Sequence, residues 1–459
     1  MSSVPVDDSD VPGRSRPQRL WKWALVAAAG VAVATLPSVW IDEPTIARAA
    51  TVAGVCLILW LSEIVPPYVP TFVLWVLTPL LLLPLGEEFA LERVLGWSAD
   101  PILALFLGGF TLSVAAGRYG IDTWIARIAL RLSRGDRRAL LVLTATATAT
   151  LSMWMSNIAA TAMMIAALRP LLAGMPDDDR FRRALLVGIA LGGNFGGIAT
   201  PIGSGPNAIA IAALARDHPI SFLSWMAFAL PLAGGLLLAG LAFLALRFRV
   251  SGTSRLPDLP LLAPSGGARW VIAIFFATVA AWLTEPVHGT SSALVALVAT
   301  VVLFGSGLLN RDDLARLDWS TLVLIAGGIG LGNLFEQSGL VAAVAGSVPW
   351  ESVSPAGRLL VLCSASAVLA ALMSNTAAAT MLIPLAASFD PSPSTAVLIA
   401  VAASLGIPFV VSTPPNAMVY GEGGLRSADL LVPGLLLMVL GIVLVSLTGP
   451  IVLGAVGIP

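Results

Sequence analysis

The chain has 459 residues, of which 57% are hydrophobic and 11% are charged, and its formal net charge at pH 7 is -1. Soluble domains carry about 25% charged residues, so this chain has too few to cover a water-facing surface, and we expect a polytopic membrane protein. The nearly neutral charge argues against a nucleic-acid partner, which requires a basic face. Only two cysteines occur, Cys56 and Cys363, in apolar segments, which excludes a disulfide framework and a thiolate metal site.

Residues 1–19 are rich in Pro, Ser, Asp and Arg, which predicts a disordered cytoplasmic tail. Residues 20–48 contain the first long apolar segment, which we interpret as a retained transmembrane helix and not as a signal peptide. A helix needs about 20 mainly apolar residues to cross a bilayer. By this criterion the predicted spans are 23–40, 49–65, 68–85, 99–117, 184–214, 222–246, 270–285, 291–308, 320–337, 395–420 and 428–450.

Two further apolar segments, 139–173 and 356–389, are too long for one crossing, and each has a Ser-Asn pair near its middle. We interpret both as re-entrant hairpins, in which two half-length helices meet at a polar turn. Arg and Lys in short loops stay cytoplasmic, and the re-entrant arrangement places all the large basic clusters on one side. It predicts an inner-membrane protein with eleven transmembrane helices, a cytoplasmic N-terminus and an extracytoplasmic C-terminus.

The two halves of the chain share motifs in the same order, about 220 residues apart. For example, Met-Ser-Asn-Ile-Ala-Ala at 155–160 recurs as Met-Ser-Asn-Thr-Ala-Ala at 373–378. The predicted copies are 49–246 and 270–453, joined by a cytoplasmic linker at 247–269. Each copy holds five crossings and a hairpin, and because five is odd the copies must be inverted. Inverted repeats with interrupted helices are typical of secondary transporters, which bind their solute near the membrane midplane.

The predicted spans 184–214 and 395–420 are interrupted by Gly-Ser-Gly-Pro-Asn at 203–207 and Ser-Thr-Pro-Pro-Asn at 412–416. Proline breaks the helix and frees backbone groups that need a partner at membrane depth. The start of a half-helix offers N–H groups to an anion, and its end offers carbonyls to Na⁺. No Lys, Arg, Asp, Glu or His lies in the two tips and two breaks. A bound anion therefore needs accompanying cations, which predicts coupling to Na⁺.

Simpler interpretations exist for each feature. A Ser-Asn pair in a membrane helix is more often a contact between helices, but four polar breaks paired by the repeat favour a binding site. A proton-coupled carrier would need a buried ionisable group. Glu63, Glu336 and Glu422 are candidates, although each is more simply explained as interfacial charge that reaches water. We expect no enzyme, because the spans offer no nucleophile–base pair and no metal ligands.

The Ser-Asn tips and Pro-Asn breaks, in this order, resemble the divalent anion/sodium symporter (DASS) family of the ion transporter superfamily, over residues 20–453. The resemblance implies an elevator-type homodimer in the lipid bilayer, in which the hairpins and broken helices slide against a scaffold. It also implies Na⁺ as the coupling ion, no organic cofactor, and a small divalent anion as substrate, such as the C4-dicarboxylates succinate, malate or fumarate. A dicarboxylate exchanger and a carrier of another oxyanion, such as sulfate, are the alternatives.

The resemblance assigns roles to specific residues. The substrate-binding residues that it implies are Ser156, Asn157, Ser204, Ser374, Asn375, Thr376 and Thr413. The Na⁺ ligands that it implies are Ser152, Asn157, Gly203, Asn375 and Ser412. Two positions depart from the family pattern: Ile158 stands where the first tip would have threonine, and Ala370 stands where the second sodium site would have a hydroxyl group. These departures leave the substrate and the number of coupled Na⁺ ions open.

Overall fold

The computed structural model describes residues 30, 41–62, 64–215, 218–254, 266–340, 343, 353–389 and 392–458. The predicted tail at 1–19 and most of the predicted first helix at 20–48 lie outside the described residues. Within them the regular elements are all helical, apart from one isolated β-bridge between Asp136 and Thr253. The predicted all-α class is confirmed.

Most α-helices of the first half overlap the predicted apolar segments, while those at 91–97 and 121–132 lie outside them. The helices of this half are α2 (Pro44–Ser62), α3 (Val69–Leu82), η1 (Leu83–Leu85), η2 (Glu87–Phe89), α4 (Leu91–Trp97), α5 (Pro101–Arg118), α6 (Ile121–Leu132), α7 (Arg137–Ser152), α8 (Asn157–Leu172), α9 (Arg180–Gly196), α10 (Gly205–Leu214) and α11 (Phe222–Arg247). Several begin at a side chain that accepts a hydrogen bond from a free backbone N–H, as Asp100 does for α5 and Asp136 for α7.

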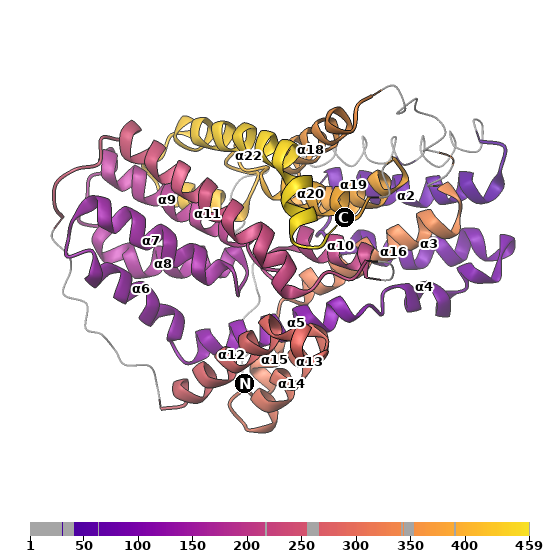
Figure 1. Ribbon diagram of the computed structural model, residues 1–459, viewed down its shortest axis with the longest axis horizontal. Helices are drawn as coiled ribbons and strands as arrows, with labels where there is room; N and C mark the ends of the chain where they lie inside the picture. Colours follow the sequence, from indigo (N-terminus) through magenta and orange to yellow (C-terminus); the bar gives the residue numbers. More distant parts are fainter. Residues whose placement is uncertain are drawn as a thin grey trace, which may run out of the picture.

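The described part of the second half is likewise a series of long and short helices. Its helices are α12 (Ala268–Leu283), α13 (Glu285–His288), α14 (Ser292–Gly305), α15 (Arg311–Ala315), α16 (Trp319–Gln337), α18 (Pro355–Leu372), α19 (Asn375–Phe389), α20 (Pro393–Ser404), α21 (Pro414–Gly421) and α22 (Ser427–Ala455). Figure 1 places α6 to α9 and α11 at one end of the molecule and α2, α3, α4 and α16 at the other, with α10, α19 and α20 between them.

Six of the described helices are long and apolar enough, by length and composition, to cross a membrane: α2, α5, α11, α16, α18 and α22. The predicted span at 68–85 contains α3, which continues into η1 as one apolar helical segment, Val69–Leu85, and the predicted span at 291–308 contains α14, which has only 14 residues. A helix of this length rises only about 21 Å, less than the hydrocarbon core of about 30 Å. The structure thus supports a multi-pass membrane protein, while the number of eleven spans and the re-entrant hairpins stay predictions.

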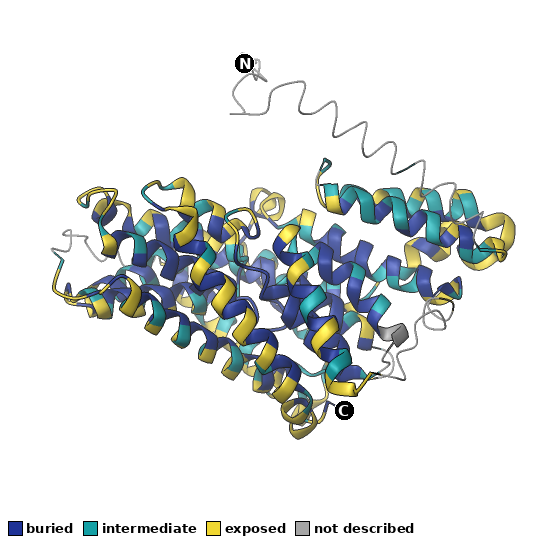
Figure 2. Ribbon diagram, turned by 90° about the horizontal axis from the view of Figure 1, so that it is seen from above, coloured by how far each residue is buried: buried dark blue, intermediate teal, exposed yellow. Residues whose placement is uncertain are grey.

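The helix pairs at the predicted hairpins exchange partners between the halves. Both α7 and α8 pack against α9, and α8 also packs against α21 of the second half; both α18 and α19 pack against α20, and α19 also packs against α10 of the first half. Two glycines of α9 allow its backbone to approach α7 closely. A Cβ at Gly192 would lie 2.3 Å from the Ala145 carbonyl oxygen, and a Cβ at Gly196 would lie 2.3 Å from the Ala149 carbonyl oxygen. The central helices α10 and α20 are almost wholly buried (Figure 2).

Glycines also allow close packing in two further helix pairs, α5 with α14 and α16 with α3. A Cβ at Gly108 of α5 would lie 2.5 Å from the Cβ of Ala296 on α14. Gly327 of α16 faces Thr71 of α3, and the Thr71 hydroxyl donates a hydrogen bond of 3.0 Å to the Val323 carbonyl. These pairs lie beside the central helices, because α5 and α16 both pack against α10.

Candidate functional site

The first predicted tip is a four-residue turn between α7 and α8. Ser156 caps α8, since its hydroxyl accepts a hydrogen bond of 3.2 Å from the Ala159 N–H. The hydroxyl oxygen of Ser152, the last residue of α7, lies 2.7 Å from Asn157 Oδ1 and 2.7 Å from the Gly193 carbonyl oxygen of α9. A hydroxyl has one proton, so it donates to one of these oxygens at a time. Three oxygens therefore converge at the tip without a charged side chain.

The first break, between α9 and α10, is held by Asn207. Its side-chain amide donates to the carbonyls of Gly197 at 2.9 Å and Thr200 at 2.8 Å, which satisfies backbone groups freed by the break. The break lies against the first tip, because a Cβ at Gly197 would stand 2.5 Å from Asn157 Oδ1. Gly203 in turn is packed against Gly197, whose carbonyl oxygen a Cβ at Gly203 would approach to 2.5 Å.

The second predicted tip lies between α18 and α19, and it contacts the first break. A Cβ at Gly205, the first residue of α10, would lie 2.3 Å from Thr376 Oγ1. Ser374 and Asn375 precede Thr376 in the same turn, and both are half-buried. The position that departs from the family pattern, Ala370, is fully buried, and Gly406 of the second break packs against its backbone.

The second break, between α20 and α21, is held by Asn416 in the way that Asn207 holds the first. The Asn416 amide donates to the carbonyls of Ile407 at 2.8 Å and Phe409 at 2.9 Å. Its Oδ1 accepts a hydrogen bond of 3.1 Å from the Asn194 amide of α9. The second break is thus joined to α9, the helix that leads into the first break, inside the protein. The predicted site residues Ser412 and Thr413 are both buried in this loop.

The structure brings most of the predicted site residues into one connected region. It runs from Ser152 and Asn157 at the first tip, through 197–205 in the first break, to Thr376 at the second tip. Two polar atoms in this region, Ser204 Oγ and Asn375 Oδ1, are buried without a hydrogen-bond partner among the described residues. No described hydrogen bond joins Asn375 to Ser412, the predicted ligands of a second sodium ion.

The asparagine amides that hold the breaks were not singled out from the sequence. The signal was present, because each asparagine follows a proline at equivalent positions of the two motifs. The sequence does not show, however, that the amide reaches carbonyls seven to ten residues earlier in the chain. Asn194, which joins α9 to the second break, lies in neither motif.

The two candidate proton carriers that the structure describes, Glu336 and Glu422, lie outside this region. Glu336 is exposed, and Glu63 lies outside the described residues. Glu422 forms an ion pair of 3.0 Å with Arg169, whose side chain is 67% exposed. Nearby, the buried Arg182 donates to the carbonyls of Glu422 and Gly423. These contacts attach the end of α21 to helices of the first half, so they stabilise the fold.

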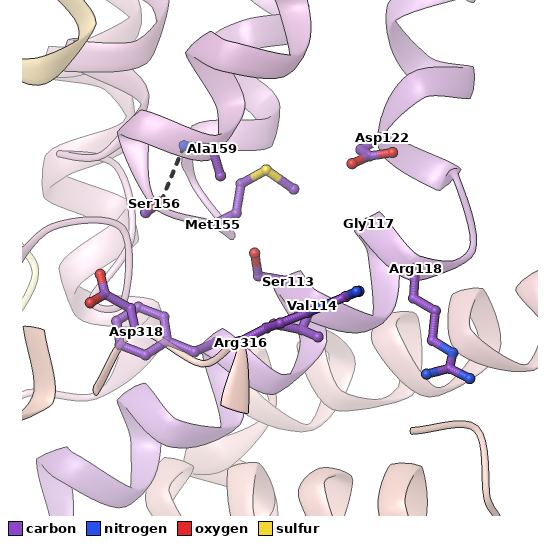
Figure 3. A pocket seen from close by; sticks show the side chains of 11 residues that line it. Ser113, Val114, Gly117, Arg118, Asp122, Met155, Ser156, Ala159, Arg316 and Asp318 are labelled. Atoms are coloured by element: carbon purple, nitrogen blue, oxygen red, sulfur yellow. Dashed lines mark hydrogen bonds between the residues drawn. The ribbon is translucent and has the colours of Figure 1, made fainter. Parts of the chain in front are cut away.

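A cavity of about 260 Å³ opens beside the first tip, between α5, α6, α8 and the segment that joins α15 to α16 (Figure 3). Burial raises the pKa of Asp122 above its ordinary value, although hydrogen bonds from Thr123 act in the opposite direction. The charged side chains of this cavity were not predicted as part of a site. The cavity is lined by Phe110, Ser113, Val114, Gly117, Arg118, Asp122, Met155, Ser156, Ala159, Arg316 and Asp318.

Residues 57–397 match the sequence profile of a family described as citrate transporters. The chain is 28% identical over 358 residues to the inorganic phosphate transporter PHO87 of Saccharomyces cerevisiae, which is 75% of this chain and 39% of the yeast protein. It is 28% identical over 446 residues to the sodium-dependent dicarboxylate transporter SdcS of Staphylococcus aureus, which is 86% of this chain and 84% of SdcS. The chain spans less than half the length of the yeast relatives that it matches.

The fold is similar to a crystal structure of the YdaH transporter of Alcanivorax borkumensis, with a TM-score of 0.59. The similarity covers 86% of this chain and 99% of the YdaH chain, at 17% sequence identity. At this identity the similarity concerns the fold alone.

Proposed function

The chain belongs to the citrate transporter family, and from this premise we propose that it is a secondary carrier of a small divalent anion coupled to Na⁺. The family relationship expected from the tip and break motifs is confirmed. A transporter family also argues for a carrier and against an enzyme.

One observation carries the proposal: the first tip, the first break and the second tip form a continuous region of uncharged polar and backbone groups. Asn157 contacts Gly197, and Thr376 contacts Gly205. Between them, Ser204 Oγ and Asn375 Oδ1 lack partners within the described residues. A buried polar atom without a partner costs about 1–3 kcal/mol. A ligand with hydrogen-bonding groups would remove this cost, so the region favours occupancy by a polar solute.

The oxygens of Ser152, Asn157 and Gly193 support a sodium site at the first tip, because hydroxyl, amide and carbonyl oxygens suit a hard cation. We propose Ser152, Asn157 and Gly203 as its ligands. The second proposed pair, Asn375 and Ser412, has no hydroxyl at position 370, and it would form the weaker site. Substrate contacts are proposed for Ser156, Asn157, Ser204, Ser374, Asn375, Thr376 and Thr413.

We propose a C4-dicarboxylate as substrate, in keeping with the dicarboxylate that SdcS is named for. Phosphate is the second candidate, because PHO87 is named as an inorganic phosphate transporter. Dicarboxylate exchange and sulfate transport are further alternatives.

We also propose an elevator motion of the hairpins and broken helices, a homodimer, an inner-membrane location and the predicted inverted repeats.

The test is Na⁺-dependent thermal stabilisation of the purified full-length protein, because a ligand that binds the folded state raises the melting temperature. Succinate, malate, fumarate, citrate, sulfate and phosphate are compared in sodium chloride and in choline chloride. We expect the C4-dicarboxylates to stabilise the protein in sodium chloride only. In proteoliposomes, uptake driven by a Na⁺ gradient supports symport, and uptake that needs only internal dicarboxylate supports exchange. If no anion stabilises the protein or enters the vesicles, the proposal is wrong.

Replacing Ile158 with threonine tests whether the first tip still follows the family pattern. The Ile158 side chain is 49% exposed, so a hydroxyl can be introduced without opening a cavity. We expect Ile158→Thr to keep or increase the affinity for C4-dicarboxylates, measured as the half-saturation concentration of uptake. An affinity loss of about tenfold or more, equal to 1.4 kcal/mol, would show that this tip is adapted to another substrate.

A further inference from the structure

The two tips and two breaks contain no charged side chain, but the structure places an arginine from a distant segment beside the first tip. Arg316 follows α15 in the chain, 160 residues after Ser156, and both side chains line the 260 Å³ cavity. In Figure 3 the Arg316 side chain extends across the cavity, next to Ser113 of α5 and on the opposite side from Asp122. An anion at this tip would therefore meet a guanidinium group.

The charges around Arg316 leave its guanidinium only partly compensated. The buried carboxylate of Asp313 accepts from the Asn310 N–H at 2.9 Å and forms a close ion pair with Arg118. Its second oxygen lies 3.8 Å from Arg316 Nη1, beyond hydrogen-bond distance. One carboxylate is thus shared by two guanidinium groups, and Arg118 holds it more closely. The Arg316 side chain is 68% exposed, so its guanidinium group is accessible to a second anion.

The two remaining carboxylates of the cavity are engaged elsewhere. Asp318 caps α16, because it accepts hydrogen bonds from the Thr321 N–H at 3.0 Å and from the hydroxyl groups of Ser320 and Thr321. The positive end of the helix dipole also offsets its charge. Asp122 accepts from the backbone and side chain of Thr123, and burial, which raises its pKa, disfavours its charged form. Neither carboxylate forms a described ion pair with Arg316.

We propose that Arg316 binds a carboxylate or other oxyanion group of the substrate at the first tip, and so supplies positive charge that the tips and breaks lack. The inference rests on the proposed function and deepens it. A guanidinium group can bind a carboxylate through two parallel hydrogen bonds, and Ser113 and Ser156 offer hydroxyl donors in the same cavity. Because Arg316 and Ser156 belong to different segments of the chain, one anion can meet both only while the tip lies next to the α15–α16 segment. Arg316 would then increase the affinity for substrate that enters from the membrane side to which the cavity opens.

The test compares Arg316→Gln with Arg311→Gln in the full-length protein in proteoliposomes. Arg311 is exposed on the same short helix and does not line the cavity, so both variants lose one positive charge. The half-saturation concentration of succinate is measured separately for substrate supplied from each side. We expect Arg316→Gln to raise it about threefold to fivefold from one side, the size expected for a partly exposed ion pair, and Arg311→Gln to leave it unchanged. Arg316→Lys, which keeps the charge, should recover part of the affinity.

Ionic strength provides a second readout. The difference between the wild type and Arg316→Gln should shrink at high salt, because salt screens exposed charges. If both glutamine variants behave alike while the wild type transports succinate, or if Arg316→Gln acts equally from both sides, the role of Arg316 is wrong. If the wild type neither binds nor transports any anion, the proposed function itself fails, which is a different outcome.

Discussion

Replacing Asn157 with alanine is expected to reduce anion uptake at least about 100-fold. The change removes the amide that faces Ser152 and Gly197, and with it contacts to both the proposed anion and the proposed Na⁺. Hydrogen bonds that involve a charged group contribute about 1.5–3 kcal/mol each, and each 1.36 kcal/mol is a factor of ten. Asn375→Ala should have an equally large effect. Uptake of labelled succinate into proteoliposomes measures both.

These variants must be compared with one that leaves the site intact. Gln337→Ala is a suitable control, because Gln337 is exposed at the end of α16 and belongs to neither tip nor break. It should keep most of its uptake. All three variants should insert into the membrane and elute as folded protein. If Asn157→Ala or Asn375→Ala transports at the wild-type rate, the binding site has been placed wrongly.

The second large effect is expected for Gly205→Ala, which adds a single methyl group between the first break and the second tip. The new Cβ would lie 2.3 Å from Thr376 Oγ1 and 2.9 Å from Thr376 Cβ, so the tip must move. Overpacking of this kind costs about 1–3 kcal/mol. We expect a lower melting temperature and loss of most uptake, because Thr376 is displaced from the proposed substrate site.

Gly234→Ala on α11 provides the matched control, since a Cβ at Gly234 meets nothing within 4 Å. Alanine stabilises a helix interior by about 0.5–1 kcal/mol relative to glycine, so this variant should keep its uptake and melt at the same temperature or slightly higher. Wild-type uptake by Gly205→Ala would instead mean that the contact between α10 and the second tip is unimportant for transport.

The sequence predicted those parts of the fold that depend on local chemistry. Ser156 at the start of α8 and Pro206 at the start of α10 have conformational preferences that act within a few residues. The number of spans was harder to predict, because hydropathy does not show where a helix ends. The segment at 291–308, for example, was predicted as a span and contains a helix of 14 residues.

The candidate site was predictable where the motifs recur and unpredictable where distant segments meet. The residues of the two tips could be proposed because they lie in repeated motifs. The cavity could not, since Arg118, Asp122 and Arg316 have no pattern in the chain and meet Ser156 only through packing. The role of Asn207 could not be predicted for a related reason. Its amide donates hydrogen bonds to carbonyls of the break, and the sequence alone does not show that these carbonyls lie beside it.

The exchange of α10 and α21 between the halves has a consequence for biosynthesis. The partners of α10 include α19 and α20, and those of α21 include α8 and α9. When the ribosome has completed the first half, α10 still lacks the helices that will cover it, although its residues from Gly205 to Ile211 are all buried in the finished protein. We therefore expect that neither half reaches its final packing alone, and that α10 becomes covered only after α19 and α20 have been inserted.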